Sequence, residues 1–276
     1  MSSLFNKSQI EKIISFALEA GQIAALAFKD KNFSIERKSD NSQVTTADIA
    51  VSNFLREKLN EEFTEIPVIC EEGDLREITQ ETFFLIDPID GTSSFISNSV
   101  EFAVNIALVQ NKKAIFGLIY APLFEGGKMV FSDEEGKVVL WEGMILRSGA
   151  RKILKQVQDD SVGGGKKLRI ITSARTKDAD ILTYITRLHP NLLQNFTVEK
   201  LSSAVKFFRL LEGDANLYLH LRESMEWDIA PGQALVELMG GKVKNLFFNQ
   251  SEIKIGEDLG YKKPNFLNRS FVAFIN

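Results

Sequence analysis

Apolar residues recur at helical spacing near the start of the chain and predict two helices there. In the first, Ser8 and Glu11 have the pattern of a capping box, in which two side chains bond the free backbone amides at a helix start. Thr45 and Asp48 form a similar capping pair at the start of the second. The apolar residues that line one face are Ile10, Ile13, Ile14 and Ala17 in the first helix and Ala47, Val51, Phe54 and Leu55 in the second.

Short apolar runs predict buried strands, and two of these strands run directly into acidic residues. Residues 83–86 lead into the hexapeptide Asp-Pro-Ile-Asp-Gly-Thr at 87–92, and residues 68–70 lead into Glu71. Pro88 cannot continue a sheet ladder, and the Asp-Gly pair that follows it is typical of turns. We therefore expect the strand to end at residue 86 and the two aspartates to lie in a turn.

The second half of the chain alternates predicted strands and helices, as in an α/β unit. A polar and basic segment with three consecutive glycines precedes it and predicts a loop or insertion between two lobes. Asp228 is the expected N-cap of the last helix, which a Gly-Gly pair ends. The predicted divisions are an N-terminal α+β lobe at 1–145, an insertion at 146–167 and a C-terminal α/β lobe at 168–276. The predicted elements are a hairpin from 102–108 to 115–120, strands at 168–172 and 216–221, and helices at 178–188, 202–211 and 229–239.

The acidic residues of the hexapeptide are the strongest candidates for chemistry. Asp87 and Asp90 lie so close together that they repel each other unless a cation lies between them, and Mg2+ takes oxygen ligands of this kind. The alternative is a capped turn with two solvated aspartates, and capping is likewise the alternative role of Asp48 and Asp228. Phosphatases that form an aspartyl-phosphate have their two aspartates two residues apart. The spacing of three, with a proline between, counts against a covalent aspartyl enzyme.

Composition narrows the class of protein. The chain has 276 residues, of which 44% are hydrophobic and 25% are charged, so it can bury a large core. Its net charge of −4 gives no electrostatic reason to expect nucleic acid as a partner. The single cysteine, Cys70, lies in an apolar run and is expected in the core of a protein from a reducing compartment. With neither a signal peptide nor a membrane-spanning segment evident, the expected location is the cytoplasm, and peripheral association with the inner membrane stays open.

Taken together, the acidic segments resemble the inositol monophosphatase superfamily of metal-dependent, lithium-sensitive phosphatases. The matching segments are 44–48, 71–72, 87–92 and Trp227 with Asp228, followed by the Gly-Gly helix end, in the order of that family. Within it, the chain is most similar to the CysQ-type 3′(2′),5′-bisphosphate nucleotidases, on the segments 101–108, 117–122 and 225–228 and on Ser203 with Lys206. The resemblance implies an α+β or α/β fold, a layered αβαβα sandwich of the inositol monophosphatase and fructose-bisphosphatase type.

The resemblance also implies an activity and a set of site residues. The expected reaction is the conversion of 3′-phosphoadenosine 5′-phosphate to AMP and phosphate, with inositol 1-phosphate hydrolysis as the nearest alternative and a non-catalytic metal- or nucleotide-binding protein as a remote one. The enzyme would need two or more Mg2+ ions, act on a small phosphorylated substrate and be a monomer or homodimer. The implied catalytic residues are Asp48, Glu71 and Thr92; the metal ligands are Glu71, Asp87, the Ile89 carbonyl, Asp90 and Asp228; and the substrate contacts are Gly91, Thr92, Ser203 and Lys206.

Three positions depart from the pattern of CysQ-type proteins. Ser93 stands where a lysine usually follows Asp-Gly-Thr. Arg175 replaces a substrate-contacting histidine, and His220 replaces an arginine. These last two exchanges are expected to keep a potential cation at each position, although an arginine and a histidine do not bind phosphate with the same geometry.

Overall fold

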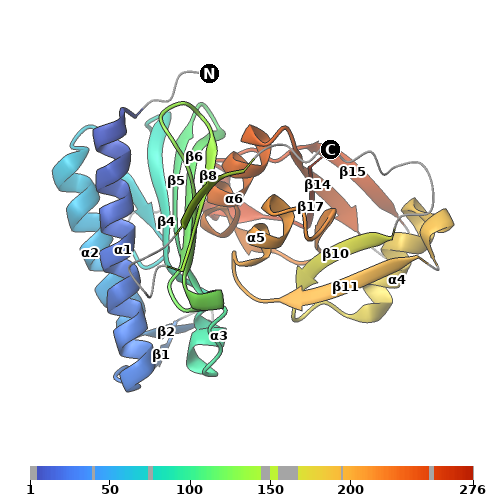
Figure 1. Cartoon of the computed structure of the whole chain (residues 1–276), viewed down its shortest axis with the longest axis horizontal. Helices are drawn as coiled ribbons and strands as arrows, with labels where there is room; N and C mark the ends of the chain where they lie inside the picture. The colour runs from blue at the N-terminus through green and yellow to red at the C-terminus, as the bar shows by residue number, and fades with distance from the viewer. Residues whose placement is uncertain are drawn as a thin grey trace.

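Five layers of secondary structure are stacked side by side in the protein (Figure 1). The computed structural model describes residues 5–38, 41–73, 77–143, 150–154, 167–193, 195–248 and 252–275. Helices α1 and α2 cover one face of a seven-stranded sheet, helices α5 and α6 lie between this sheet and a six-stranded sheet, and α4 covers the far face of the second sheet. The layered αβαβα sandwich expected from the sequence is therefore confirmed.

The outer helical layer consists of α1 (Lys7–Asp30) and α2 (Thr46–Glu62). The capping box of α2 is formed by Thr45 and Asp48 as predicted. The prediction for α1 was wrong, because its capping box is formed by Asn6 and Gln9. Asn6 has the extended backbone that a capping residue needs, so the helix begins before Ser8 and its hydroxyl falls in the first turn.

The first sheet has the strand order β3-β4-β5-β6-β7-β8-β9, with β3 parallel to β4 and the other neighbours antiparallel. The predicted hairpin is present as β5 and β6. The strands are β3 (Val68–Cys70), β4 (Thr82–Asp90), β5 (Ala103–Gln110), β6 (Lys113–Ala121), β7 (Lys128–Ser132), β8 (Val138–Glu142) and β9 (Ala150–Ile153).

Strand β9 corrects part of the predicted insertion at 146–167. Residues 150–153 pair with β8 and form the edge of the sheet, so the first sheet extends past the predicted boundary at residue 145. An edge strand commonly carries charged residues, and this polarity was the basis for predicting a loop. The rest of the predicted insertion, at 146–149 and 155–166, lies outside the described residues.

The second sheet has the strand order β11-β10-β12-β17-β14-β15. Strand β10 is parallel to both β11 and β12, and the remaining neighbours are antiparallel. Its strands are β10 (Leu168–Ser173), β11 (Phe196–Leu201), β12 (Leu217–His220), β14 (Lys242–Phe248), β15 (Ile253–Asp258) and β17 (Phe271–Phe274). The shorter elements are β1 (Ile35–Arg37), β2 (Gln43–Thr45), α3 (Thr92–Ile96), β13 (Ser224–Met225) and β16 (Leu267–Asn268).

The layer between the sheets contains α5 (Lys206–Leu211) and α6 (Glu226–Leu238), while α4 (Asp178–Leu188) lies outside. Two glycines allow close packing in this central layer. A Cβ at Gly117 of β6 would lie 2.1 Å from the carbonyl oxygen of Pro231, and a Cβ at Gly232 would lie 2.3 Å from the ring of Phe207. The first approach holds α6 against the first sheet, where its acidic residue can reach those of β4, and the second packs α6 against α5.

Among the described residues, no helix is both long enough and apolar enough to cross a membrane.

Candidate active site

A bulge in β4 brings Asp87 and Asp90 to the same side of the first sheet. Asp87 pairs with Asn105 and Asp90 pairs with Ala103, so three steps along β4 correspond to two steps along β5. In a regular strand, residues three apart face opposite sides, and the extra residue of a bulge restores a common side. The prediction that the strand ends at residue 86 was therefore wrong, because β4 continues to Asp90. Pro88 is tolerated within the strand because it lies in the bulge, where no ladder hydrogen bond is required.

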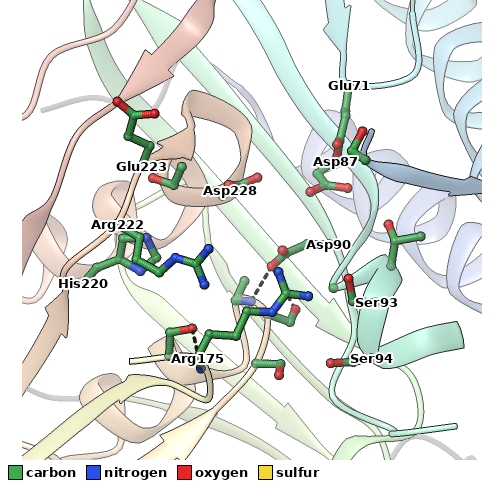
Figure 2. Close-up of a pocket in the computed structure, with 18 of the residues that line it drawn as sticks. Glu71, Asp87, Asp90, Ser93, Ser94, Arg175, His220, Arg222, Glu223 and Asp228 are labelled. Carbon is green, nitrogen blue, oxygen red and sulfur yellow. Dashed lines mark hydrogen bonds between the residues drawn. The ribbon is translucent and has the colours of Figure 1, made fainter. Parts of the chain in front are cut away.

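Three carboxylates from three different elements meet beside this bulge (Figure 2). Glu71 follows β3, Asp87 belongs to β4, and Asp228 lies in the first turn of α6. One carboxylate oxygen from each lies within 4.8 Å of the others. Asp90 lines the same pocket, so the four acidic ligands predicted from the sequence come together.

Asp228 is both a helix cap and part of this cluster. Its Oδ2 accepts a hydrogen bond of 2.8 Å from the backbone N–H of Met225. The prediction that Asp228 is the N-cap residue was wrong, because α6 begins at Glu226 and its N-cap residue is Met225; Asp228 lies at the third helical position and bonds back to the N-cap amide. The two roles considered for Asp228 are thus compatible.

Burial and mutual repulsion make the cluster a poor place for four negative charges. Burial is the main cause that raises the pKa of Asp87 and Asp228, and the neighbouring carboxylates raise it further. Burial raises the pKa of Glu71 to about 7, although Lys38 opposes the shift. The donors are hard oxygen atoms, which Mg2+ prefers. The chemistry of this donor set therefore fits a divalent cation that would relieve the repulsion.

Asp90 is held in place by the segment before α5. Its Oδ2 accepts a hydrogen bond of 2.8 Å from the Ser203 hydroxyl and another from the backbone N–H of Ala204. The side-chain amide of Asn105 lies 3.4 Å from the same oxygen. Because these donors surround one oxygen of Asp90, its carboxylate is fixed between the two sheets.

The predicted pair of Asp48 and Thr92 is present. The Thr92 hydroxyl lies 3.0 Å from Oδ1 of Asp48 and 3.2 Å from the carbonyl oxygen of Ile89. The other oxygen of Asp48 accepts hydrogen bonds from the backbone and hydroxyl of Thr45, at 2.8 and 2.5 Å. Burial nevertheless raises the pKa of Asp48 above its usual value. The capping box of α2 thereby orients a buried carboxylate toward Thr92.

Gly91 has a conformation that only glycine adopts easily. Its φ is 92°, and a Cβ at this position would lie 2.8 Å from the carbonyl oxygen of Glu101. This sharp turn places the start of α3, with Thr92, directly after Asp90. Gly91, Thr92 and Ser93 all line the pocket.

The helix predicted at 202–211 is shorter than expected, and Ser203 lies outside it. Helix α5 begins at Lys206, and Ser203 precedes it with a φ of 54°. Lys206 is only 4% exposed, its ammonium group donates to the carbonyl oxygen of Ser203, and burial lowers its pKa to about 8. Lys206 is therefore not a solvated lysine on the surface of a helix. Both residues line the pocket, where they also support Asp90.

The pocket has a volume of about 620 Å³ and carries positive charge on another of its walls. Arg175 and Arg222 line it and point into it from the second sheet (Figure 2). Burial lowers the pKa of His220 to about 3, so this ring is uncharged near neutral pH. The expectation that His220 keeps a cation at its position was therefore wrong, whereas Arg175 fulfils it.

Several residues of the site were not identified from the sequence. Lys38 lies 2.6 Å from Glu72 and 3.6 Å from Glu71, although the acidic motifs themselves contain no lysine. Asn105 is completely buried in β5, and it could have been identified as a site residue because it is a polar residue within an apolar run. Arg222 gave no signal, because its role depends on the path of the chain after β12.

Comparisons with known proteins identify the family of the chain. The chain matches the inositol monophosphatase family over residues 6–263. It is 31% identical to the 3′(2′),5′-bisphosphate nucleotidase CysQ of Salmonella typhimurium, over 95% of this chain and 98% of that protein. It is 29% identical to the CysQ protein of Buchnera aphidicola, over 97% of this chain and 94% of that protein.

Solved structures show the same relationship. The crystal structure of CysQ from Bacteroides thetaiotaomicron, described as a bacterial member of the inositol monophosphatase family, superposes with a TM-score of 0.77. It has 27% sequence identity, and the alignment covers 99% of both chains. An inositol monophosphatase from Thermotoga maritima shares the fold, with a TM-score of 0.69 at 17% identity over 97% of this chain and 92% of that one. From its sequence match, its layered fold and its bulged acidic strand, the chain belongs to the inositol monophosphatase family.

Proposed function

We propose that the protein is a magnesium-dependent 3′(2′),5′-bisphosphate nucleotidase that removes the 3′-phosphate from 3′-phosphoadenosine 5′-phosphate and leaves AMP. The relatives named CysQ support this substrate, since they match over nearly the whole chain. The buried thiol of Cys70 supports action in a reducing compartment such as the cytoplasm.

The observation that carries the proposal is the buried acidic cluster beside the Asp48–Thr92 pair. Mg2+ bound to such a cluster would polarise the phosphate, lower the pKa of a bound water and neutralise developing charge. We assign the metal ligands to Glu71, Asp87, the Ile89 carbonyl, Asp90 and Asp228. Five ligands from three segments of the chain are more than one ion needs, because Mg2+ usually keeps several waters, and this supports two or more ions.

The neighbouring residues supply the proton transfer. The Thr92 hydroxyl can donate its proton to Oδ1 of Asp48 while it accepts a proton from the attacking water, since both oxygens are within hydrogen-bonding distance. The raised pKa of Asp48 makes it a better proton acceptor than an exposed aspartate. We also assign Glu71 to the catalytic residues, because its carboxylate belongs to the acidic cluster that would hold the metal.

The remaining contacts orient the substrate. The backbone N–H groups of Gly91 and Thr92 lie at the sharp turn before α3, where they can donate hydrogen bonds to a phosphate oxygen. We assign Ser203 and Lys206 to the substrate contacts because both line the pocket; the Ser203 hydroxyl also binds Asp90, and Lys206 donates to the Ser203 carbonyl. No covalent intermediate on the enzyme is required by this arrangement.

Removal of the metal tests the proposal. Activity should be abolished by EDTA and restored by Mg2+, and Ca2+ should restore it poorly because its coordination is larger and less strictly octahedral. Lithium should inhibit the restored enzyme, as the family resemblance implies. Full activity in a metal-free buffer would rule out the proposed function.

A further inference from the structure

Two arginines enter the pocket from the second sheet. Arg175 and Arg222 each follow the end of a strand by two residues, after β10 and β12 respectively. These strands are parallel neighbours, so their carboxyl ends lie at the same edge of the sheet. Both side chains line the pocket, and Figure 2 shows both guanidinium groups directed into it.

Neither guanidinium is committed to another part of the protein. Within the described part of the chain, Arg175 makes only a backbone hydrogen bond to Ser173, and Arg222 makes no ion pair or hydrogen bond. Arginine is otherwise paired readily in this protein, as Arg209 shows with Glu125 and Glu199. Both arginines are exposed, so their guanidinium groups are free to form charge-assisted hydrogen bonds to an anion that enters the pocket.

The other basic residues near this wall differ from the two arginines in burial, charge or position. Lys206 is buried and bonded to the Ser203 carbonyl. His220 stacks on Phe271, with ring centroids 5.0 Å apart and planes at 14°, and is neutral near pH 7. Arg37 of β1 also lines the pocket, but it comes from the hairpin beside the first sheet.

The acidic cluster lies apart from Arg222, although another acidic residue, Glu223, also lines the pocket on the side of Arg222. Glu71 and Asp87 lie on the side of the first sheet, and Arg222 lies across the pocket from them (Figure 2). A volume of about 620 Å³ is within the usual range for a small-molecule site. One phosphate of a ligand can therefore lie at the acidic cluster with its metal while a second anionic group reaches the arginines.

We propose that Arg175 and Arg222 together bind the second phosphate of the substrate, the one that is not cleaved. The inference rests on the proposed function, in which the substrate is a bisphosphate and its 5′-phosphate remains in the product. Guanidinium groups suit this role because they form paired hydrogen bonds to phosphate oxygens and stay charged at any physiological pH. Arg222 thus supplies the positive charge that His220 does not.

The test compares two substrates that differ only in the second phosphate. Turnover of 3′-phosphoadenosine 5′-phosphate and of adenosine 3′-phosphate is measured for the wild type, Arg175→Ala, Arg222→Ala and the double variant. Each single variant should lower kcat/KM for the bisphosphate by about tenfold, mainly through KM, because a charge-assisted hydrogen bond to phosphate is lost. The rate with adenosine 3′-phosphate should stay within about twofold, which also shows that each variant is folded.

A matched control is Arg269→Ala, since Arg269 is exposed and does not line the pocket. This variant should leave kcat/KM unchanged for both substrates. The double variant should lose most of the preference for the bisphosphate, by about 100-fold if the two arginines act independently.

Failure of the inference can be distinguished from failure of the proposed function. If the wild type hydrolyses the bisphosphate but the arginine variants keep its preference over adenosine 3′-phosphate, the arginines do not bind the second phosphate and the proposed function stands. Equal losses on both substrates would likewise overturn the inference, because they would indicate a structural role. A wild type that does not hydrolyse the bisphosphate would overturn the proposed function and the inference with it.

Discussion

Replacing Asp228 by asparagine separates its role as a metal ligand from its role as a helix cap. Asparagine has nearly the same shape and keeps an oxygen that can accept the 2.8 Å hydrogen bond from Met225, so the start of α6 should be preserved. The substitution removes one negative charge from the cluster. Turnover should fall by at least about a thousandfold, the order of magnitude for loss of a group that stabilises charge in the transition state.

The same variant should be more stable than the wild type when metal is absent. Two unit charges on oxygens that lie within 4.8 Å of each other repel by at least about 3.5 kcal/mol at an effective dielectric constant of about 20. Proton uptake by the cluster relieves part of this repulsion, so we expect Asp228→Asn to raise the free energy of unfolding by about 1–3 kcal/mol at pH 7. The folded-state pKa of Asp228 lies above its unfolded value, so its carboxylate destabilises the metal-free wild type as pH rises above about 4. The extra stability of Asp228→Asn over the wild type should therefore shrink as pH falls toward 4.

Urea unfolding followed by circular dichroism, with and without Mg2+, measures these effects. Mg2+ at 100 times its dissociation constant should stabilise the wild type by about 2.7 kcal/mol, and the variant should gain much less. Asp30→Asn is a suitable control, because Asp30 is exposed at the end of α1 and should change stability by less than about 0.5 kcal/mol. If Asp228→Asn keeps its turnover, or destabilises the metal-free protein, the account of Asp228 as a metal ligand is wrong.

Three further predictions concern buried groups. Lys206→Met should lower kcat/KM by about tenfold or more on both 3′-phosphoadenosine 5′-phosphate and inositol 1-phosphate. The reason is that Lys206 supports the turn at Ser203, which in turn holds Asp90. A loss confined to the bisphosphate would instead indicate that Lys206 contacts the nucleotide directly. Cys70 is 1% exposed, and burial raises the pKa of its thiol to about 11. A thiol reagent should therefore label the native protein very slowly, whereas the unfolded protein should react with about one equivalent of reagent. Rapid labelling of the native protein would refute the burial of Cys70. Burial lowers the pKa of His220 to about 3, so between pH 6.5 and 3 only the unfolded state binds a proton at this residue. The free energy of unfolding of the wild type should therefore fall by about 2 kcal/mol between pH 7 and 5, and His220→Phe should not show this loss. Equal losses in the two proteins, measured by urea unfolding, would contradict this prediction.

The parts of the fold that follow local rules could be predicted from the sequence. The capping pair of α2, the hairpin of β5 with β6 and the limits of α4 depend on side-chain periodicity and turn residues close in sequence. The edge strand β9 could not be predicted, because its polar residues are stabilised by pairing with β8. The continuation of β4 through Asp90 also depends on a partner strand, since β5 accommodates the bulge.

The candidate site likewise has some features that could be predicted from the sequence and others that could not. The acidic residues could be identified because several motifs occur in one chain, and the structure brings Glu71, Asp87 and Asp228 together. The surroundings of these acids could not be predicted, because they come from distant segments. Lys38 approaches Glu71 from the hairpin before α2, and the backbone of Ala204 reaches Asp90 across the interface of the two sheets.

The central claim is that this acidic pocket hydrolyses a nucleoside bisphosphate with the help of Mg2+. A side-by-side assay of 3′-phosphoadenosine 5′-phosphate and inositol 1-phosphate, at equal concentrations with Mg2+ and with EDTA, tests it most directly. We predict that kcat/KM for the bisphosphate is at least about tenfold higher, which corresponds to about 1.4 kcal/mol of additional transition-state binding, and that EDTA abolishes both rates. A preference for inositol 1-phosphate, or turnover that survives EDTA, would contradict the account.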